Sequence, residues 1–255
     1  MTDHIIYDDN WAAIYEKYTG MRGRVTEADD TISFLERHAI RGDALELGVG
    51  NGRVAVPLSE RGVRVEGIDN SDSMLQLLAT RTKQVKAWRA DIANFRSQQR
   101  YNLVYCIYNT FKLLLTRESQ IGCLRSAAEA LDDEGILIIE LDVPSLDGLI
   151  NCQRTTTLAL DDENTILHAE VHDPLNQNLA STLLWFSGTS VRRLSHRVRY
   201  VYHQELDTMA QCAGLRLAER WGDWARGPFT KESKRHISAY RRNTSAGRVG
   251  SGALA

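Results

Sequence analysis

The sequence lacks the features of a membrane protein, a disulfide scaffold and a nucleic-acid binder. No apolar run approaches the roughly 20 residues that a membrane-spanning helix needs. Its four cysteines are widely spaced, with no C-x-x-C pair, which argues against disulfides and zinc. The net charge of −2 offers no basic field to nucleic acid. The acidic start MTDHIIYDDN is unlike a secretion signal, so we expect a cytoplasmic protein with reduced thiols.

Short apolar strands alternate with amphipathic helices between DALELGV and GILIIELD. Ser71 is the expected N-cap of the helix SDSMLQLLATRT. Strands that alternate with helices predict a parallel sheet covered on both faces. The expected fold class is therefore α/β, with a doubly wound Rossmann-like sheet.

The remainder of the chain divides into segments with different patterns. Residues 1–30 carry aromatic residues at helical spacing and predict an N-terminal helical cap. Residues 145–203 alternate polar and apolar side chains between turn signals, which predicts an antiparallel insertion. Residues 31–144 and 204–243 form the expected core, and 244–255 are expected to be disordered.

The stretch LELGVGNGR contains three alternate glycines, Gly48, Gly50 and Gly52, behind an apolar run. Glycine suits positive φ and close approach of the backbone to another group. Glu46 precedes the glycines, and Asp69 ends the next strand, where a carboxylate can accept hydrogen bonds from ribose hydroxyls. The dinucleotide pattern G-x-G-x-x-G does not fit, because Arg53 stands at its third glycine. We therefore expect a nucleoside ligand without a diphosphate.

These motifs resemble the class I S-adenosylmethionine-dependent methyltransferases over nearly the whole chain. The resemblance implies the strand order 3-2-1-4-5-7-6, with only the seventh strand antiparallel. It also implies cofactor contacts from GIDNSDSML, RADI and YNLVYCIYN in addition to the first motif. The implied cofactor residues are Glu46, Gly48, Gly50, Gly52, Asp69, Asn70, Met74, Asp91, Ile92 and Ile107.

A narrower resemblance is to glycine N-methyltransferases and amino-sugar N,N-dimethyltransferases, which carry W-x-x-Y-x-x-x-x-x-x-R before the first strand. YEKYTGMRGR places Tyr15, Tyr18 and Arg24 in this order, with Tyr15 replacing the tryptophan and Arg24 one residue nearer to the second aromatic position. The resemblance implies that Arg24 binds the cofactor carboxylate and that both tyrosines cover its methionine portion. The alternatives are that the two tyrosines are buried by ordinary helix packing and that Arg24 is a solvated surface residue.

The loop after the fifth strand bears on the methyl acceptor. Glycine-methylating relatives place an arginine there for the substrate carboxylate, and Asp142 of IELDVPS aligns with it. We therefore hypothesise an acceptor with a cation or an N–H donor, contacted by Asp142 and by Asn109. With Tyr18, these two residues are the catalytic candidates, although Asp142 could also be a solvated loop residue.

Further candidates for the substrate site are aromatic or polar residues of the fourth strand and the insertion. Tyr108, His168 and Trp185 are expected to contact the acceptor. An aromatic or otherwise apolar acceptor is implied by Tyr105, Tyr108, Leu183, Trp185 and Phe186. His168 shares a strand face with His172, but no third metal ligand is near in sequence, and we expect no metal. Ordinary strand and core packing would explain these residues equally well.

The predicted function is transfer of a methyl group from S-adenosylmethionine, with S-adenosylhomocysteine as product, to a small molecule. The leading prediction is in-line N- or C-methylation of an amine- or indole-bearing natural product. O-methylation of a phenol is the alternative. A nucleic-acid methyltransferase is disfavoured because YNTF follows the fourth strand and no base-flipping motif is present. A non-catalytic cofactor-binding protein and an NAD-dependent oxidoreductase are disfavoured too. We expect no membrane partner and a monomer or homodimer.

Overall fold

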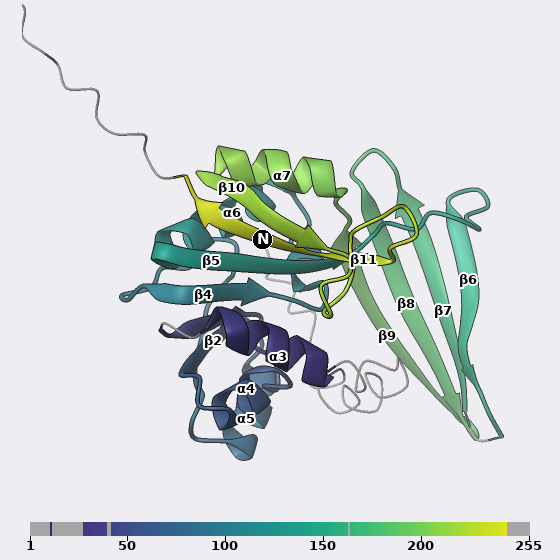
Figure 1. The fold of residues 1–255 in the computed structure, drawn as a ribbon. Helices are drawn as coiled ribbons and strands as arrows, with labels where there is room; N and C mark the ends of the chain where they lie inside the picture. Colours follow the sequence, from purple (N-terminus) through teal and green to yellow (C-terminus); the bar gives the residue numbers. More distant parts are fainter. Residues whose placement is uncertain (1–10, 12–27, 40–41, 163, 244–255) are drawn as a thin grey trace, which may run out of the picture.

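A computed structural model describes residues 11, 28–39, 42–162 and 164–243 of the chain (Figure 1). The predicted cap over 1–30, apart from Trp11 and 28–30, lies outside the described residues. The predicted tail at 244–255 lies outside them too.

The central sheet has seven strands in the order β10-β11-β5-β4-β1-β2-β3 (Figure 1). Neighbouring strands are parallel except at β11, which is antiparallel to both β5 and β10. The strands are β1 Ala44–Leu47, β2 Val65–Asp69, β3 Lys86–Arg89, β4 Tyr101–Cys106, β5 Leu131–Asp142, β10 Leu215–Trp221 and β11 Arg235–Arg242. This topology confirms the predicted strand order and its single antiparallel seventh strand.

Helices cover the two faces of this sheet. They are α3 Ala28–His38, α4 Ala55–Glu60, α5 Asp72–Arg81, α6 Arg117–Ala130 and α7 His203–Cys212, with the 3₁₀ turn η1 Thr110–Leu113 after β4. Ser71 caps α5 as predicted, because its hydroxyl accepts a hydrogen bond from Met74 N at 3.2 Å. None of the described helices is long and apolar enough to cross a membrane.

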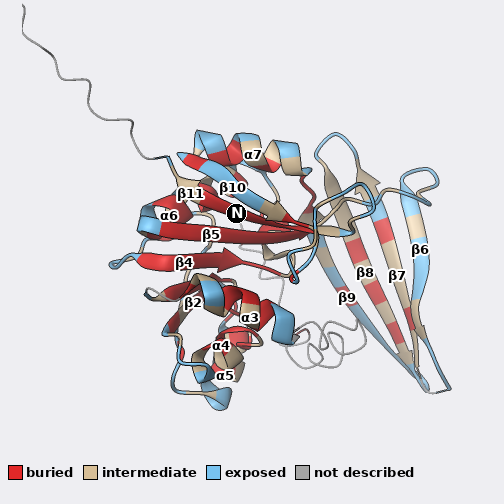
Figure 2. Cartoon of the chain, in the orientation of Figure 1, coloured by how far each residue is buried: buried red, intermediate tan, exposed pale blue. Residues whose placement is uncertain are grey.

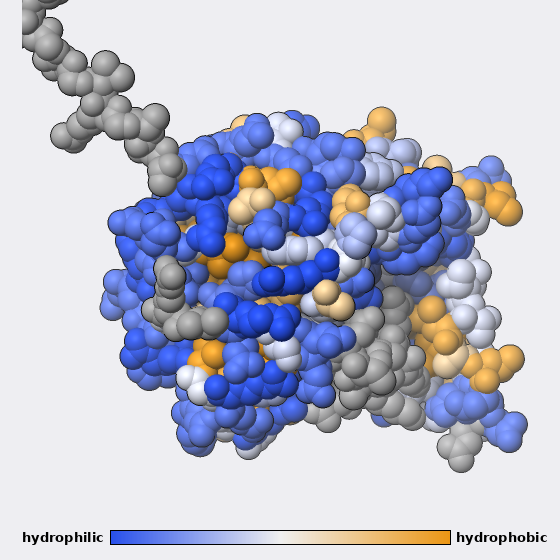
Figure 3. All heavy atoms as spheres, in the orientation of Figure 1, coloured by the Kyte–Doolittle hydropathy of each residue, from blue (hydrophilic) through white to orange (hydrophobic). Residues whose placement is uncertain are grey.

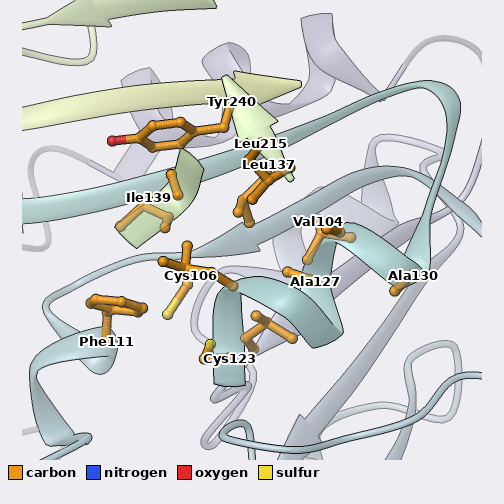
Figure 4. Packing of buried hydrophobic residues seen from close by; sticks show 14 of the residues in the cluster. Val104, Cys106, Phe111, Cys123, Ala127, Ala130, Leu137, Ile139, Leu215 and Tyr240 are labelled. Carbon is orange, nitrogen blue, oxygen red and sulfur yellow. The ribbon is translucent and has the colours of Figure 1, made fainter. Parts of the chain in front are cut away.

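Two apolar clusters hold the layers together, one on each face of the sheet. Figure 4 shows the first, in which Cys123 of α6 points toward Cys106 of β4 and Phe111 of η1. The second joins Phe34 of α3 and Leu58 of α4 to the opposite face. Figure 2 shows these central strands as the most buried part of the molecule. Both faces are therefore covered, as the apolar strands predicted.

A second sheet of four antiparallel strands stands beside the first (Figure 1). Its strands are β6 Gln153–Leu160, β7 Asn164–Asp173, β8 Asn178–Ser187 and β9 Ser190–Arg199. On one face, Trp11 packs on Ile166, Leu183, Trp185 and Leu194. Figure 3 shows that hydrophobic side chains also gather at the surface over this sheet. The predicted antiparallel insertion is therefore present.

Candidate active site

The loop after β1 is built from backbone that only glycine adopts easily. Gly48, Gly50 and Gly52 have φ values of 77°, 54° and 79°. A Cβ at Gly48 would collide with Thr110, and one at Gly52 would collide with Leu78 of α5. A Cβ at Gly50 would meet no atom within 4 Å. Gly48 and Gly52 therefore allow close packing, whereas Gly50 keeps its backbone open.

Asp69 at the end of β2 connects this loop to the start of α5. Its Oδ2 accepts a hydrogen bond from Gly50 N at 2.8 Å, and its Oδ1 accepts one from Ser71 N at 2.9 Å. Burial raises the pKa of the Asp69 carboxyl, although these N–H groups oppose the rise. Each carboxylate oxygen has a second lone pair, so Asp69 can also accept hydrogen bonds from a ligand.

Glu46 lies beneath the glycine turn and is 4% exposed. Tyr105 Oη donates a hydrogen bond to its Oε2 at 3.1 Å. Burial raises the pKa of Glu46 to about 8, and the hydrogen bond from Tyr105 opposes the rise. The group therefore carries a proton at neutral pH and supports the turn from below.

The loop after β4 contains two consecutive non-glycine residues with left-handed backbone. Tyr108 and Asn109 have φ values of 55° and 66°, a conformation that costs an L-residue roughly 1–2 kcal/mol. Tyr108 N donates to Glu140 Oε2 of β5 at 2.6 Å, and the guanidinium carbon of Arg53 lies 3.6 Å from the centre of the Tyr108 ring. Contacts from β5 and from the glycine loop therefore stabilise the strained turn.

Asn109 and Asp142 form a reciprocal pair across the ends of β4 and β5. Asn109 Nδ2 donates to Asp142 Oδ2 at 2.7 Å, and Asp142 N donates to Asn109 Oδ1 at 2.8 Å. Lys112 Nζ donates to the Asp142 carbonyl at 2.9 Å. Two of the three catalytic candidates, Asn109 and Asp142, thus lie together, and each holds the other in place.

A cavity of about 660 Å³ lies between the carboxyl ends of these strands and the second sheet. Its wall contains eight of the predicted site residues. These are Gly48, Gly50, Asp69, Asn70, Met74, Asp91, Ile92 and Tyr108. Such a cavity, with apolar side chains and a few polar groups, is typical of small-molecule sites.

Other predicted residues lie beside the cavity rather than in its wall. Glu46, Gly52 and Ile107 are buried beneath the strand ends. Asn109 and Asp142 adjoin the wall through Tyr108 and Thr110. Tyr15, Tyr18 and Arg24 lie outside the described residues, so their roles stay predictions.

The two candidates on the second sheet are engaged elsewhere in the fold. Trp185 is 6% exposed, packs in the Trp11 cluster and donates from Nε1 to Asn164 Oδ1 at 3.0 Å. His168 lies 3.8 Å from Glu170 Oε2 through its Nδ1. Neither residue is part of the cavity wall, which favours the packing alternative for both.

Several lining residues were missed by the sequence analysis. They are Ala90, Ala93, Thr110, Leu113, Leu114, Leu115, Ser119, Ala180, Ser181, Thr182, Arg193, Ser195, His196 and Arg197. Those of the 110–115 loop adjoin a motif that was recognised. Those of β8 and β9 come from both faces of their strands, so the alternation of polar and apolar residues could not single them out.

Within the described part of the chain, no cluster of three or more His, Cys, Asp or Glu side chains could hold a metal ion. The histidines noted for their shared face have other contacts. His172 Nε2 and Tyr200 Oη form a hydrogen bond of 3.1 Å.

Comparison with known proteins agrees with this geometry. A family model described as "Methyltransferase domain" matches residues 44–135. The structure of the CcbJ methyltransferase from Streptomyces caelestis superposes with a TM-score of 0.89 at 35% identity, covering 95% of this chain and 100% of that chain.

Two further relatives are more distant. The cypemycin N-terminal methyltransferase of a Streptomyces species is 24% identical over 247 residues, which is 95% of this chain and 100% of the relative. The structure of CalS10, an amino pentose methyltransferase from Micromonospora echinaspora, has a TM-score of 0.68 at 18% identity, covering 89% of this chain and 96% of that chain. The chain belongs to the class I S-adenosylmethionine-dependent methyltransferases and is a small-molecule methyltransferase, as its motifs predicted.

Proposed function

We propose that the protein transfers a methyl group from S-adenosylmethionine to an amine nitrogen of a small natural product. The carrying observation is the Asp142 carboxylate, fixed by Asn109 directly beside the wall residues Tyr108 and Thr110. A negative charge held there accepts a hydrogen bond from an N–H of the acceptor, stabilises the cation that forms as the amine is methylated, and disfavours a phenolate. The cypemycin enzyme, named for methylation at an N-terminus, gives independent support.

The other wall of the cavity supports the proposal through residues that suit the cofactor. Asp69 has acceptor capacity for the ribose hydroxyls, and the open space at Gly50 lets backbone approach the ligand. Met74 and Ile92 offer apolar contacts beside Asp91, which suits an adenine ring. When bound, S-adenosylmethionine supplies an electrophilic methyl group.

The chain's own residues have mainly an orienting task in such a reaction. The amine lone pair forms the new N–C bond while the sulfur keeps the electrons of the broken S–C bond. An amine reacts as its neutral form, so it needs no strong base in the transition state. The rate then depends on alignment and on exclusion of water, to which the fixed Tyr108–Asn109 turn contributes.

Asp142→Asn tests the proposed charge contact. We expect the KM for an amine acceptor to rise at least tenfold, with S-adenosylhomocysteine affinity unchanged by calorimetry. Asp162→Asn, in the exposed turn after β6, is the matched control. Unchanged turnover and acceptor affinity in Asp142→Asn would show that this charge does not act on the acceptor.

O-methylation remains the second candidate because His196 lines the cavity and is a possible general base for a phenol. A panel of amines, indoles and phenols with labelled methyl donor separates the two reactions. If phenols alone are methylated and His196→Gln abolishes this turnover, the amine proposal is wrong.

A further inference from the structure

Strand β9 carries several arginines whose surroundings differ. The β8–β9 register pairs Arg193 with Leu184 and Arg197 with Ala180, which places both arginines on one face. Both line the cavity, together with Ser195 between them. Arg192 belongs to the opposite face and is not part of the cavity wall.

Arg199, near the end of the same strand, shows how this fold neutralises a structural arginine. It is 4% exposed. Its Nη1 donates to Gln120 Oε1 at 2.6 Å, and its Nη2 donates to Glu205 Oε1 at 2.6 Å. By contrast, Arg193 and Arg197 form no ion pair with any described residue. Their charges therefore remain available at the cavity wall.

The acids of the cavity wall lie on the loops of the central sheet and have partners there. Asp69 accepts from Gly50 N and Ser71 N, and Asp91 Oδ1 accepts from Ala93 N at 2.8 Å. The β8–β9 wall contributes no acid to the cavity. The cavity thus has an acidic side suited to ribose and a basic side without an assigned ligand.

We propose that Arg193 and Arg197 bind an anionic group, a carboxylate or a phosphate, of the methyl acceptor. This inference rests on the proposed function and narrows its substrate class to amines that also carry an oxyanion. Guanidinium groups bind both oxyanions through paired N–H donors.

The local geometry suits one shared anion. Four strand residues span roughly 13 Å between the two Cα atoms, so two long side chains can converge from either side. Ser195 between them, Thr182 opposite Ser195 and Ala180 opposite Arg197 are small, whereas Leu184 is opposite Arg193. The hydroxyls of Thr182 and Ser195 lie 2.9 Å apart and add polar contacts to the floor.

Protection of an exposed edge strand is a competing reason for arginine on β9, since β9 is at the edge of its sheet. That reason applies equally to Arg192. Arg192→Gln is therefore a matched control, which removes the same charge from the same strand away from the cavity.

The experiment compares paired acceptors that differ in one charge. Aromatic and aliphatic α-amino acids are paired with their methyl esters, and O-phosphorylated amino alcohols with the free amino alcohols. We expect kcat/KM to favour one class of anionic acceptor at least tenfold, which also distinguishes carboxylate from phosphate. Arg193→Gln/Arg197→Gln should remove that preference by lowering kcat/KM for the anionic partner alone. Arg192→Gln should behave as the wild type.

Equal kcat/KM for both members of every methylated pair, or an equal loss for both in the double variant, would overturn the subsite. If no amine is methylated although S-adenosylhomocysteine binds, the amine proposal fails. The anion subsite is then tested by direct binding of anions. In that case benzoate and phenyl phosphate are titrated into the S-adenosylhomocysteine complex. Binding of either that weakens at least fivefold in the double variant supports the subsite, and any other result refutes it.

Discussion

The turns after β1 and β4 lie side by side at the carboxyl end of the sheet, and both use left-handed backbone. The first does so with glycines, at little conformational cost. The second does so with Tyr108 and Asn109, and contacts from Glu140, Asp142 and Arg53 offset the strain. The two turns differ in what they expose at the cavity. Gly50 leaves its backbone open at the cavity, whereas the strained turn contributes the Tyr108 side chain to the cavity wall.

The largest effect is expected where the glycine turn meets α5. Gly52→Val places a β-branched residue at φ +79° against Leu78, and we expect it to lower the free energy of unfolding by roughly 3–5 kcal/mol. The added methyl group of Gly50→Ala meets no neighbour, so this variant should lower the free energy of unfolding by only about 1 kcal/mol. It should nevertheless lower the affinity for S-adenosylhomocysteine at least tenfold. Urea unfolding and calorimetry measure both. Equal destabilisation by the two variants would contradict the separate roles of these glycines.

The buried acid beneath the glycine turn predicts a pH effect. Because the folded-state pKa of Glu46 is about 8, the unfolded chain alone ionises this group above pH 4.5, and stability falls as pH rises toward 8. Its contribution should change by about 3 kcal/mol between pH 5.5 and pH 8. Glu46→Gln keeps an acceptor for Tyr105 and should remove this slope in urea unfolding. A wild-type and a variant curve that stay parallel would show that Glu46 ionises normally.

The strained turn depends on a buried carboxylate of β5. Glu140 is 0% exposed, accepts from Tyr108 N and lies 3.3 Å from Arg235 Nη1 through its Oε1. Glu140→Ala should cost about 2 kcal/mol of stability and lower kcat more than it changes the affinity for S-adenosylhomocysteine. Glu134→Ala, on the exposed end of the same strand, is the control. Unaltered kcat in Glu140→Ala would mean that the turn does not position reacting groups.

The smallest effect isolates the strain itself. Asn109→Ala and Asn109→Gly both lose the amide pair with Asp142, but only glycine adopts φ 66° freely. We expect Asn109→Gly to be the more stable variant by about 1 kcal/mol in urea unfolding. Identical stability would show that the left-handed backbone at this residue relaxes without cost.

The cavity residues contributed by the central sheet were predictable because their signals are local. Gly48, Gly50 and Asp69 lie within a short stretch of sequence, and the strand–turn–helix pattern around them fixes their place at the edge of the sheet. The alternation of elements predicted the parallel sheet, and the family resemblance implied its strand order.

The residues that we propose to contact the methyl acceptor were less predictable, because their contacts join segments that are distant in the sequence. Asn109 meets Asp142 only because β4 and β5 are neighbours. The sequence shows that β9 is rich in arginine, but it does not show that Arg193 and Arg197 meet the cavity while Arg192 does not. Trp185 likewise had an aromatic signal that fits a pocket or a core equally well.

The thiols beneath α6 have a practical consequence. Burial raises the pKa of both Cys106 and Cys123, whereas Cys152 and Cys212 are exposed. An alkylating reagent should therefore modify the exposed pair at once and reach the buried pair only when the layer opens. The charge of Asp91, which lines the cavity, adds to the raised pKa of Cys123, so this thiol lies near the part of the wall that we propose for adenine. The rate at which Cys123 is alkylated would therefore report how strongly a bound nucleoside suppresses local opening of the protein.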